Sequence, residues 1–362
     1  MAQNALARLT RIELAPPRYL AFPTAGIDVS TSGVKVAVLE ERLHGIELVA
    51  FGQERLPLGS VTGGEMTDRA AVVAAVRSLA KKHHVKFANI ALSESRSYLF
   101  EAVAPGTDDT GWRTAVEQRL DEYIPLPPSE VAFDLVSTGV VDNQTQVLGV
   151  GYARRVIEES LSAFDEAGVT VRAVENEMFS MSRALLPLGD QETVLVIDIG
   201  KTTTKIAIIS HRVPRFETTL DVGGHALTLA VQKHFGVTEE EAKRVKAEHG
   251  LVSGEGNEEY IEAMLSTVSV IREEIVRRLD YWQSRAAAGT MHEPVSRAVL
   301  VGGNATVRGL SEYLETSLRV PVALGDVFAN LAPRDAWLPP LDYLESLAYA
   351  TAIGLALREY GT

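Results

Sequence analysis

The sequence VLVIDIGKTTTKIAIIS, residues Val194–Ser210, decides the fold of this chain. Two apolar, β-branched runs flank the polar turn Gly200–Thr204, and this pattern predicts two buried strands joined by a tight turn. The first run ends on Asp198, whose carboxylate is therefore expected at the edge of the sheet. Backbone N–H groups and hydroxyls in such a turn suit phosphate oxygens, and an adjacent carboxylate suits Mg²⁺ with its waters. The candidate binding residues of the turn are Gly200, Lys201, Thr202 and Thr203.

A second stretch, Ala25–Leu39 (AGIDVSTSGVKVAVL), repeats this arrangement. An apolar entry leads to Asp28, a turn of hydroxyl residues follows, and alternating valines form the returning strand. One such stretch alone would fit an ordinary hairpin, but two predict similar halves that face each other across a cleft. Asp28 and Asp198 would then hold Mg²⁺ between them, through water because Mg²⁺ dehydrates reluctantly. The candidate binding residues of this turn are Asp28, Ser30, Thr31, Ser32 and Lys35.

Two pairs of glycines add further candidate positions. Ala298–Leu310 predicts a buried strand that ends in Gly302-Gly303, followed by Asn304 and a helix start. Adjacent glycines let a flat group, such as adenine or ribose, lie against the bare backbone. The pair Gly223-Gly224 precedes another predicted helix, whose free N–H groups and positive dipole end attract anions. A plain helix cap is the alternative interpretation of this second pair.

Together these elements resemble the phosphate-1, phosphate-2 and adenosine motifs of the actin, sugar-kinase and heat-shock-chaperone ATPase superfamily. Within it, the chain most resembles the PilM family of type IV pilus assembly proteins, relatives of the division protein FtsA. The resemblance runs from about Thr24 to about Arg358 and includes the segments Leu56–Asp68, Asp121–Asp134, Gly168–Leu185 and Ala348–Glu359. The stretch EYIPLPPSEV within the second segment discriminates best, because it lies outside the nucleotide motifs.

The resemblance implies an α/β, two-lobed actin-like (ribonuclease H-like) ATPase fold with an inserted subdomain of the kind called 1C in FtsA. The implied order starts with a flexible lead-in, residues 1–23, and the first part of lobe one, residues 24–97. Next come the inserted subdomain at residues 98–168 and a return to lobe one at 169–192. Lobe two follows at 193–340, and a C-terminal helix at 341–362 crosses back to lobe one. We expect helices at Asp68–Lys82, Trp112–Tyr123, Arg154–Ala167, Glu259–Trp282 and Tyr343–Tyr360.

The resemblance also implies ATP or ADP with Mg²⁺ in the interlobe cleft, with Gly223-Gly224 and Lys246 in contact with the nucleotide. The chain departs from the family pattern at Ser30, Lys201, Lys243 and Asn304. Lys243 stands where an acidic residue often contacts ribose, and Glu241 is the candidate to compensate. We expect nucleotide binding to survive these changes.

Hydrolysis needs an additional group that orients the attacking water. Glu175 and Glu177, on the segment that re-enters lobe one, are the candidate acids. The alternative interpretation is that both are ordinary surface or helix-cap carboxylates. We therefore predict slow or absent hydrolysis.

The implied function is a cytoplasmic nucleotide-binding scaffold of type IV pilus assembly. It would bind the cytoplasmic N-terminal peptide of the inner-membrane protein PilN, as well as other pilus components, and so lie at the inner membrane through its partner. Alternatives are an FtsA-like ATPase of cell division, a related secretion protein, or a small-molecule kinase of the same fold.

Composition agrees with a protein of this kind. The 362 residues are 46% apolar and 6% aromatic, which suits two lobes with full cores. A net charge of −13 argues against nucleic acid as a partner. The chain has no cysteine, which excludes disulfides and thiolate metal sites and fits a reducing compartment. Since no window approaches the ~20 apolar residues of a membrane-spanning helix, we expect no direct membrane insertion.

Overall fold

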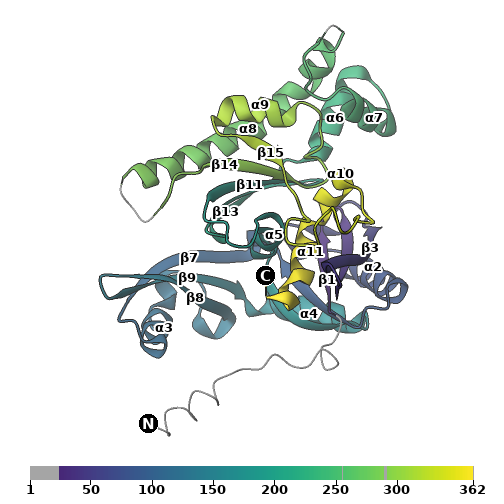
Figure 1. Cartoon of the computed structure of the whole chain (residues 1–362). Helices are drawn as coiled ribbons and strands as arrows, with labels where there is room; N and C mark the ends of the chain where they lie inside the picture. Colours follow the sequence, from purple (N-terminus) through teal and green to yellow (C-terminus); the bar gives the residue numbers. More distant parts are fainter. Residues whose placement is uncertain (1–23, 255, 289–291, 362) are drawn as a thin grey trace.

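The computed structural model describes residues 24–254, 256–288 and 292–361, so the expected lead-in lies outside the described residues. Two five-stranded sheets form the centres of two lobes, and a three-stranded sheet lies beside the first (Figure 1). Within the described ranges, no helix combines the length and the apolar composition that crossing a bilayer requires.

The sheet of lobe one has the strand order β10-β6-β1-β2-β3. Its first hairpin pairs β1 antiparallel with β2, and β1 also pairs parallel with β6. The strands are β1 (Thr24–Ser30), β2 (Gly33–Arg42), β3 (Gly45–Arg55), β6 (Phe87–Leu92) and β10 (Thr170–Asn176). Helix α2 (Arg69–Lys82) covers this sheet and begins where the Asp68 side chain accepts the N–H of Ala71, which confirms the predicted helix and its cap.

Lobe two repeats this topology, with the order β13-β12-β11-β14-β15. The sequence Val194–Ser210 forms the antiparallel hairpin of β11 with β12, and β11 pairs parallel with β14. The strands are β11 (Thr193–Ile199), β12 (Thr204–Ser210), β13 (Val213–Leu220), β14 (Arg297–Val301) and β15 (Val322–Leu324). The helices are α6 (Gly224–Phe235), α7 (Glu239–Glu248), α8 (Glu258–Ala287) and α9 (Leu310–Leu318). Helix α8 confirms the predicted helix at Glu259–Trp282 and extends beyond it.

A separate sheet lies between β6 and β10 in the chain, with the order β7-β9-β8. Its elements are β7 (Ser97–Pro105), α3 (Asp109–Glu117), β8 (Val131–Val141), β9 (Gln144–Ala153) and α4 (Arg154–Glu166); we call this segment the insertion. The bounds predicted for its first helix, Trp112–Tyr123, were wrong. Asp108 caps α3 through the N–H of Gly111, so the helix begins earlier, and a separate 3₁₀ turn at Leu120–Glu122 follows its end.

The last segment of the chain returns to lobe one. Helix α11 (Ala350–Leu357) packs against α5 (Glu177–Leu185) and against β1. A Cβ at Gly354 would lie 1.8 Å from the carbonyl oxygen of Ser180, and a Cβ at Gly26 would lie 1.9 Å from that of Ala352. Glycine is therefore required on both sides of this helix, because only the missing side chains let the backbones approach so closely.

The prediction of one continuous helix over Tyr343–Tyr360 was wrong. The structure instead contains α10 (Tyr343–Ser346), a 3₁₀ turn at Leu347–Tyr349, α11, and a final 3₁₀ turn at Arg358–Tyr360. The carbonyl of Leu347 accepts the N–H of Gly302 at 3.0 Å. Because this carbonyl bonds to lobe two rather than along its own helix, the helical ladder is interrupted there.

Candidate nucleotide-binding cleft

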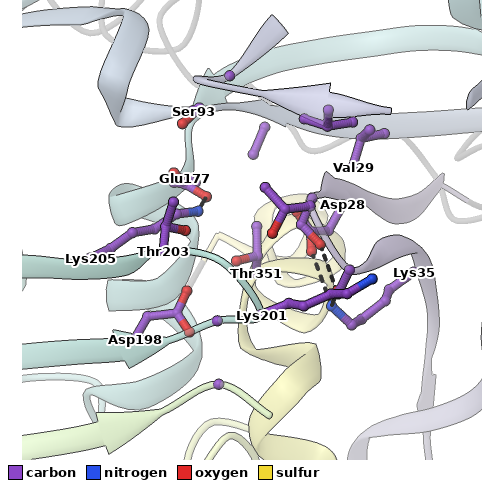
Figure 2. Close-up of a pocket in the computed structure, with 18 of the residues that line it drawn as sticks. Asp28, Val29, Lys35, Ser93, Glu177, Asp198, Lys201, Thr203, Lys205 and Thr351 are labelled. Atoms are coloured by element: carbon purple, nitrogen blue, oxygen red, sulfur yellow. Dashed lines mark hydrogen bonds and ion pairs between the residues drawn. The ribbon is translucent and has the colours of Figure 1, made fainter. Parts of the chain in front are cut away.

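A cleft of about 680 Å³ lies between the two hairpins, with residues of both lobes in its walls. Figure 2 shows the Asp28–Lys35 pair on one side, Asp198 and the Glu177–Lys205 pair on the other, and Lys201 between them. The predicted residues that line it are Asp28, Ser30, Thr31, Ser32, Lys35, Asp198, Gly200, Lys201, Thr203, Gly302, Gly303, Asn304 and Glu177. The two carboxylate-bearing turns therefore share one cavity, as the repeated pattern predicts.

Each hairpin places an aspartate opposite a lysine across its two strands. Asp28 is in register with Lys35, and Asp198 with Lys205. Lys35 Nζ lies 3.7 Å from Asp28 Oδ2 and donates to the Ser32 hydroxyl at 3.2 Å. Burial raises the pKa of Asp28 and of Asp198, although Lys35 and Lys205 respectively oppose the increase. A divalent cation at the cleft would keep both carboxylates ionised.

The donor set fits hydrated Mg²⁺ rather than a metal held by protein ligands alone. Among the described residues, no group of three or more histidine or acidic side chains could hold a metal ion. Asp28 and Asp198 supply two carboxylates to one cavity, and hydroxyl groups of Ser30 and Thr203 lie in its walls. Mg²⁺ with two such carboxylates would complete its coordination with waters and phosphate oxygens.

Lys205 has a different partner from Lys35. Lys205 Nζ donates to Glu177 Oε2 at 2.5 Å, and Glu177 Oε1 accepts the backbone N–H of Glu94 at 3.1 Å. Burial by itself would raise the pKa of Glu177, but Lys205 holds it below its usual value. Burial and the charge on Glu177 raise the pKa of Glu94 to about 10, so Glu94 is neutral at pH 7. Glu177 therefore lies in the cleft wall as one half of an ion pair.

Glu175, the other candidate acid, does not line the cleft. Its carboxylate accepts from Arg183 at 2.8 and 3.0 Å and from Arg358 at 2.6 Å. These ion pairs join β10 to α5 and to the end of the chain. Because its oxygens are taken up by two guanidinium groups away from the cavity, we do not assign Glu175 to water activation.

The start of α6 is used differently from the sequence-based expectation. The N–H of Gly224 donates to the Gly200 carbonyl at 3.0 Å, and the N–H of His225 donates to the Lys201 carbonyl at 2.8 Å. A Cβ at Gly223 would lie 2.8 Å from Thr203 N, so this glycine packs against the second turn. The expectation that these N–H groups are free to bind an anion was therefore wrong, because the adjacent turn occupies them.

Three further predicted residues, Thr202, Lys243 and Lys246, do not line the cleft. Lys243 is exposed and forms ion pairs with Glu239 and Glu240, both at 2.9 Å. Glu241 accepts the N–H and hydroxyl of Thr238 in a capping box at the start of α7, so it does not stand in for a ribose-binding acid. The ribose contact implied for this part of α7 has no counterpart in the geometry.

Comparison with known proteins shows which family the chain belongs to. The sequence profile of the family described as "Type IV pilus assembly protein PilM" matches residues 26–360. The chain belongs to this family. A solved structure described as "PilM-PilN type IV pilus biogenesis complex" is similar with a TM-score of 0.76 and 21% identity, covering 93% of this chain and 98% of that chain.

The chain is also similar to cell division and cell-shape proteins. FtsA of Streptococcus pneumoniae serotype 2 is 23% identical over 350 residues, covering 83% of this chain and 74% of FtsA. MreB of Pasteurella multocida is 28% identical over 204 residues, covering 48% of this chain and 57% of MreB. The structure of MreB5 of Spiroplasma citri bound to ADP has a TM-score of 0.54 and 15% identity, over 85% of this chain and 93% of that chain. The expected two-lobed actin-like fold is confirmed.

Sequence reasoning missed several stretches of the cleft wall, among them the segment after β6 and one residue of α11. Ser93, Ser95 and Arg96 follow β6, and Thr351 lies in α11. Thr351 stands within the apolar segment AYATAIGLALRE, where a single threonine gives no signal of a binding site. Only the return of α11 to lobe one, where it packs against β1 and α5, brings it to the cavity.

Strand β13 of lobe two contacts the insertion through Arg215. The Arg215 guanidinium donates to Glu101 of β7 at 3.3 Å and to the Thr138 hydroxyl of β8 at 3.2 Å. Two residues further along β13, Glu217 accepts from the Asn176 amide of lobe one at 2.9 Å and from the Ser97 hydroxyl at the start of β7. One strand of lobe two is thus bonded both to the insertion and to lobe one.

The same face of β13 continues into the cleft. Thr219 lies two residues beyond Glu217 and lines the cavity, and Asp221 follows it there. Residues at alternate positions of a strand share a face. One strand of lobe two therefore runs from the cavity wall to the contacts with lobe one and with the insertion.

Proposed function

We propose that this protein is a nucleotide-regulated scaffold of type IV pilus assembly, which binds ATP with Mg²⁺ in the cleft. The observation that carries the proposal is that Asp28 and Asp198, from hairpins in different lobes, line one cavity. In this proposal both carboxylates hold hydrated Mg²⁺ while Lys35 and Lys201 balance the phosphate charge. Bound Mg²⁺ would supply charge neutralisation of the phosphates.

The proposal places the nucleoside beside Gly302-Gly303. The φ angle of Gly302 is +90°, and a Cβ there would lie 2.2 Å from Asp198 Oδ1, so only glycine lets β14 end so close to that carboxylate. Gly303 is exposed, and a Cβ there would meet only the Ala348 side chain, at 3.9 Å. This open backbone leaves room for a flat ring.

The same geometry supports slow or absent hydrolysis. Glu177 is the acid in the cleft wall that is placed to orient a water molecule, but its oxygens are engaged by Lys205 and the Glu94 N–H. A carboxylate held in this way is a weak general base, because its lowered pKa reduces its affinity for the proton. Nucleotide binding would then act by lobe closure, with a coupling free energy of about 1–3 kcal/mol between cleft and partner site.

The proposed partner is a PilN-like inner-membrane protein, bound through its cytoplasmic N-terminal peptide. The similarity to the PilM-PilN complex supports this choice of partner. The contacts of β13 with the insertion support a route by which nucleotide would influence a peptide bound there. The protein would then work in the cytoplasm, held at the inner membrane by its partner.

The nucleotide site is tested by thermal unfolding with and without ATP-Mg²⁺. At a hundredfold excess over Kd we expect about 2.7 kcal/mol of stabilisation, seen as a rise in Tm. The Asp198→Ala variant should lose most of this rise, whereas the exposed-loop variant Asp335→Ala should keep it. A wild-type protein with no rise would refute nucleotide binding, and an unchanged rise in Asp198→Ala would remove Asp198 from the site.

The partner is tested by titrating the full-length protein with a PilN-like N-terminal peptide and with a scrambled peptide of the same composition. We expect the native peptide to bind at least tenfold more tightly, and ATP-Mg²⁺ to change its Kd. Equal affinities for the two peptides would exclude peptide docking. If the Kd of the native peptide is the same with and without ATP-Mg²⁺, the coupling between nucleotide and peptide is excluded, but peptide docking is not.

A further inference from the structure

The side chain of Asn304 fills the space between the diglycine turn and the start of α6. A Cβ at Gly224 would lie 1.9 Å from Asn304 Oδ1 and 2.0 Å from its Cγ, so the amide group rests directly on the α carbon of Gly224. A side chain at position 224 would displace it. The glycine at the start of α6 thus makes room for Asn304, while its N–H bonds to the second turn.

Asn304 is bonded to three different elements. Its Nδ2 donates to the Gly200 carbonyl of the β11–β12 turn at 2.8 Å. Its Oδ1 accepts from Lys246 Nζ of α7 at 2.8 Å, and its own N–H donates to the Ile199 carbonyl at 3.1 Å. Lys246 also donates to the Gly224 carbonyl at 3.1 Å. Asn304 and Lys246 together therefore tie α6 and α7 to the edge of the lobe-two sheet.

This network separates Lys246 from the cleft. Asn304 lines the cavity whereas Lys246 does not, and the ammonium group is enclosed by Asn304, Gly224 and the Thr228 hydroxyl at 3.2 Å. Burial, with a smaller effect of Lys243, lowers the pKa of Lys246 to about 8. Gly303, beside Asn304, remains open. A ring that lies on Gly303 therefore meets the Asn304 amide before it can reach the lysine.

We propose that Asn304 and Lys246 form a latch over the nucleoside end of the cleft, which weakens binding of the nucleoside half of a nucleotide and leaves binding of its phosphates unaffected. The phosphate half lies between the hairpins, and the Asn304 side chain reaches that end through its bond to the Gly200 carbonyl. The inference rests on the proposed nucleotide site and concerns its affinity and selectivity. In the wild-type protein, the triphosphate group supplies most of the affinity and the base supplies little.

The first test compares ATP-Mg²⁺ with inorganic tripolyphosphate-Mg²⁺ by calorimetric titration. The Asn304→Ala variant removes the amide and opens space beside Gly303. It should bind ATP about tenfold more tightly, because the charge-assisted hydrogen bond between Lys246 and Asn304 no longer has to be broken. Its affinity for tripolyphosphate should stay within twofold of the wild type. Asn304→Ser is the second variant if Asn304→Ala does not fold, and Lys243→Met is the matched control on the exposed side of α7.

An ATP affinity that is unchanged or weaker in Asn304→Ala overturns the latch. An equal gain for ATP and tripolyphosphate also overturns it, because the substitution would then have opened the whole cleft. Failure of both ligands to bind wild type and variant alike refutes the proposed nucleotide site. The latch remains testable in that case through the second readout.

The second readout needs no nucleotide. An amine-acylating reagent followed by mass spectrometry measures how fast Lys246 is modified, with the exposed Lys243 as internal reference. In Asn304→Ala the Lys246 rate, taken relative to that of Lys243, should rise at least threefold over its wild-type value. Equal Lys246 rates in wild type and variant would show that Asn304 does not close off the lysine.

Discussion

The Gly354→Ala variant is expected to lose about 3 kcal/mol or more of unfolding free energy, or to fail to fold. Replacing glycine by alanine inside a helix normally stabilises it by up to about 1 kcal/mol. Here the new methyl group would lie 1.8 Å from the Ser180 carbonyl oxygen and 2.5 Å from its carbon. Since the Ser180 carbonyl belongs to the backbone of α5, the overlap is relieved only by moving α11 away from α5.

Urea unfolding followed by circular dichroism measures this loss. Gly254→Ala is the matched control, because a Cβ at Gly254 would meet no heavy atom within 4 Å, and it should change the unfolding free energy by less than about 0.5 kcal/mol. If Gly354→Ala is as stable as the wild type, the close packing of α11 on α5 is wrong.

The second large effect is expected at the ion pair beside the cleft. Lys205→Met removes the cation from Glu177 and leaves a buried carboxylate next to the buried side chain of Glu94. Removing one partner of a buried pair typically costs about 3–5 kcal/mol. The double variant Lys205→Met with Glu177→Gln removes both charges of the pair, so it should recover most of this loss.

The full double-mutant cycle, measured by urea unfolding at pH 7, isolates this interaction. Glu177→Gln alone should also be destabilised, because Lys205 would then be buried without its main counter-charge. Additive losses in the double variant would show that Lys205 and Glu177 do not depend on each other. The same four proteins also provide a test of ATP hydrolysis, in which a Glu177 released from Lys205 should turn over ATP faster than the wild type does.

The hairpins could be predicted from the sequence because their patterns are local. Apolar alternation defines the strands, and the polar turns Gly200–Thr204 and Ser30–Ser32 interrupt it. The occurrence of this pattern twice also predicted that Asp28 and Asp198 share a cavity. Nothing in the hairpin sequences distinguishes Lys35 from Lys205, although one contacts its own aspartate and the other Glu177. That difference depends on α5, which approaches only one of the two lysines.

Two of the errors at the site have the same origin, since each depends on a partner from another part of the chain. Glu175 and Glu177 are only two residues apart. Glu175 nevertheless forms an ion pair with Arg358, whereas Glu177 pairs with Lys205 in the cleft wall. The N–H of Gly224 looked free for an anion, but the Gly200 carbonyl accepts it. Local sequence identifies which groups are polar, and the tertiary fold decides which of them remain available to a ligand.

The position of α11 also has a consequence for folding during translation. Strand β1 is among the first elements to be synthesised, but α11 packs against it, and the Asn89 amide of neighbouring β6 donates to the Leu355 carbonyl, 266 residues later. Lobe one therefore cannot close its interior until translation has passed Leu357. During that interval the surfaces of β1 and α5 that α11 later covers remain exposed on the growing chain.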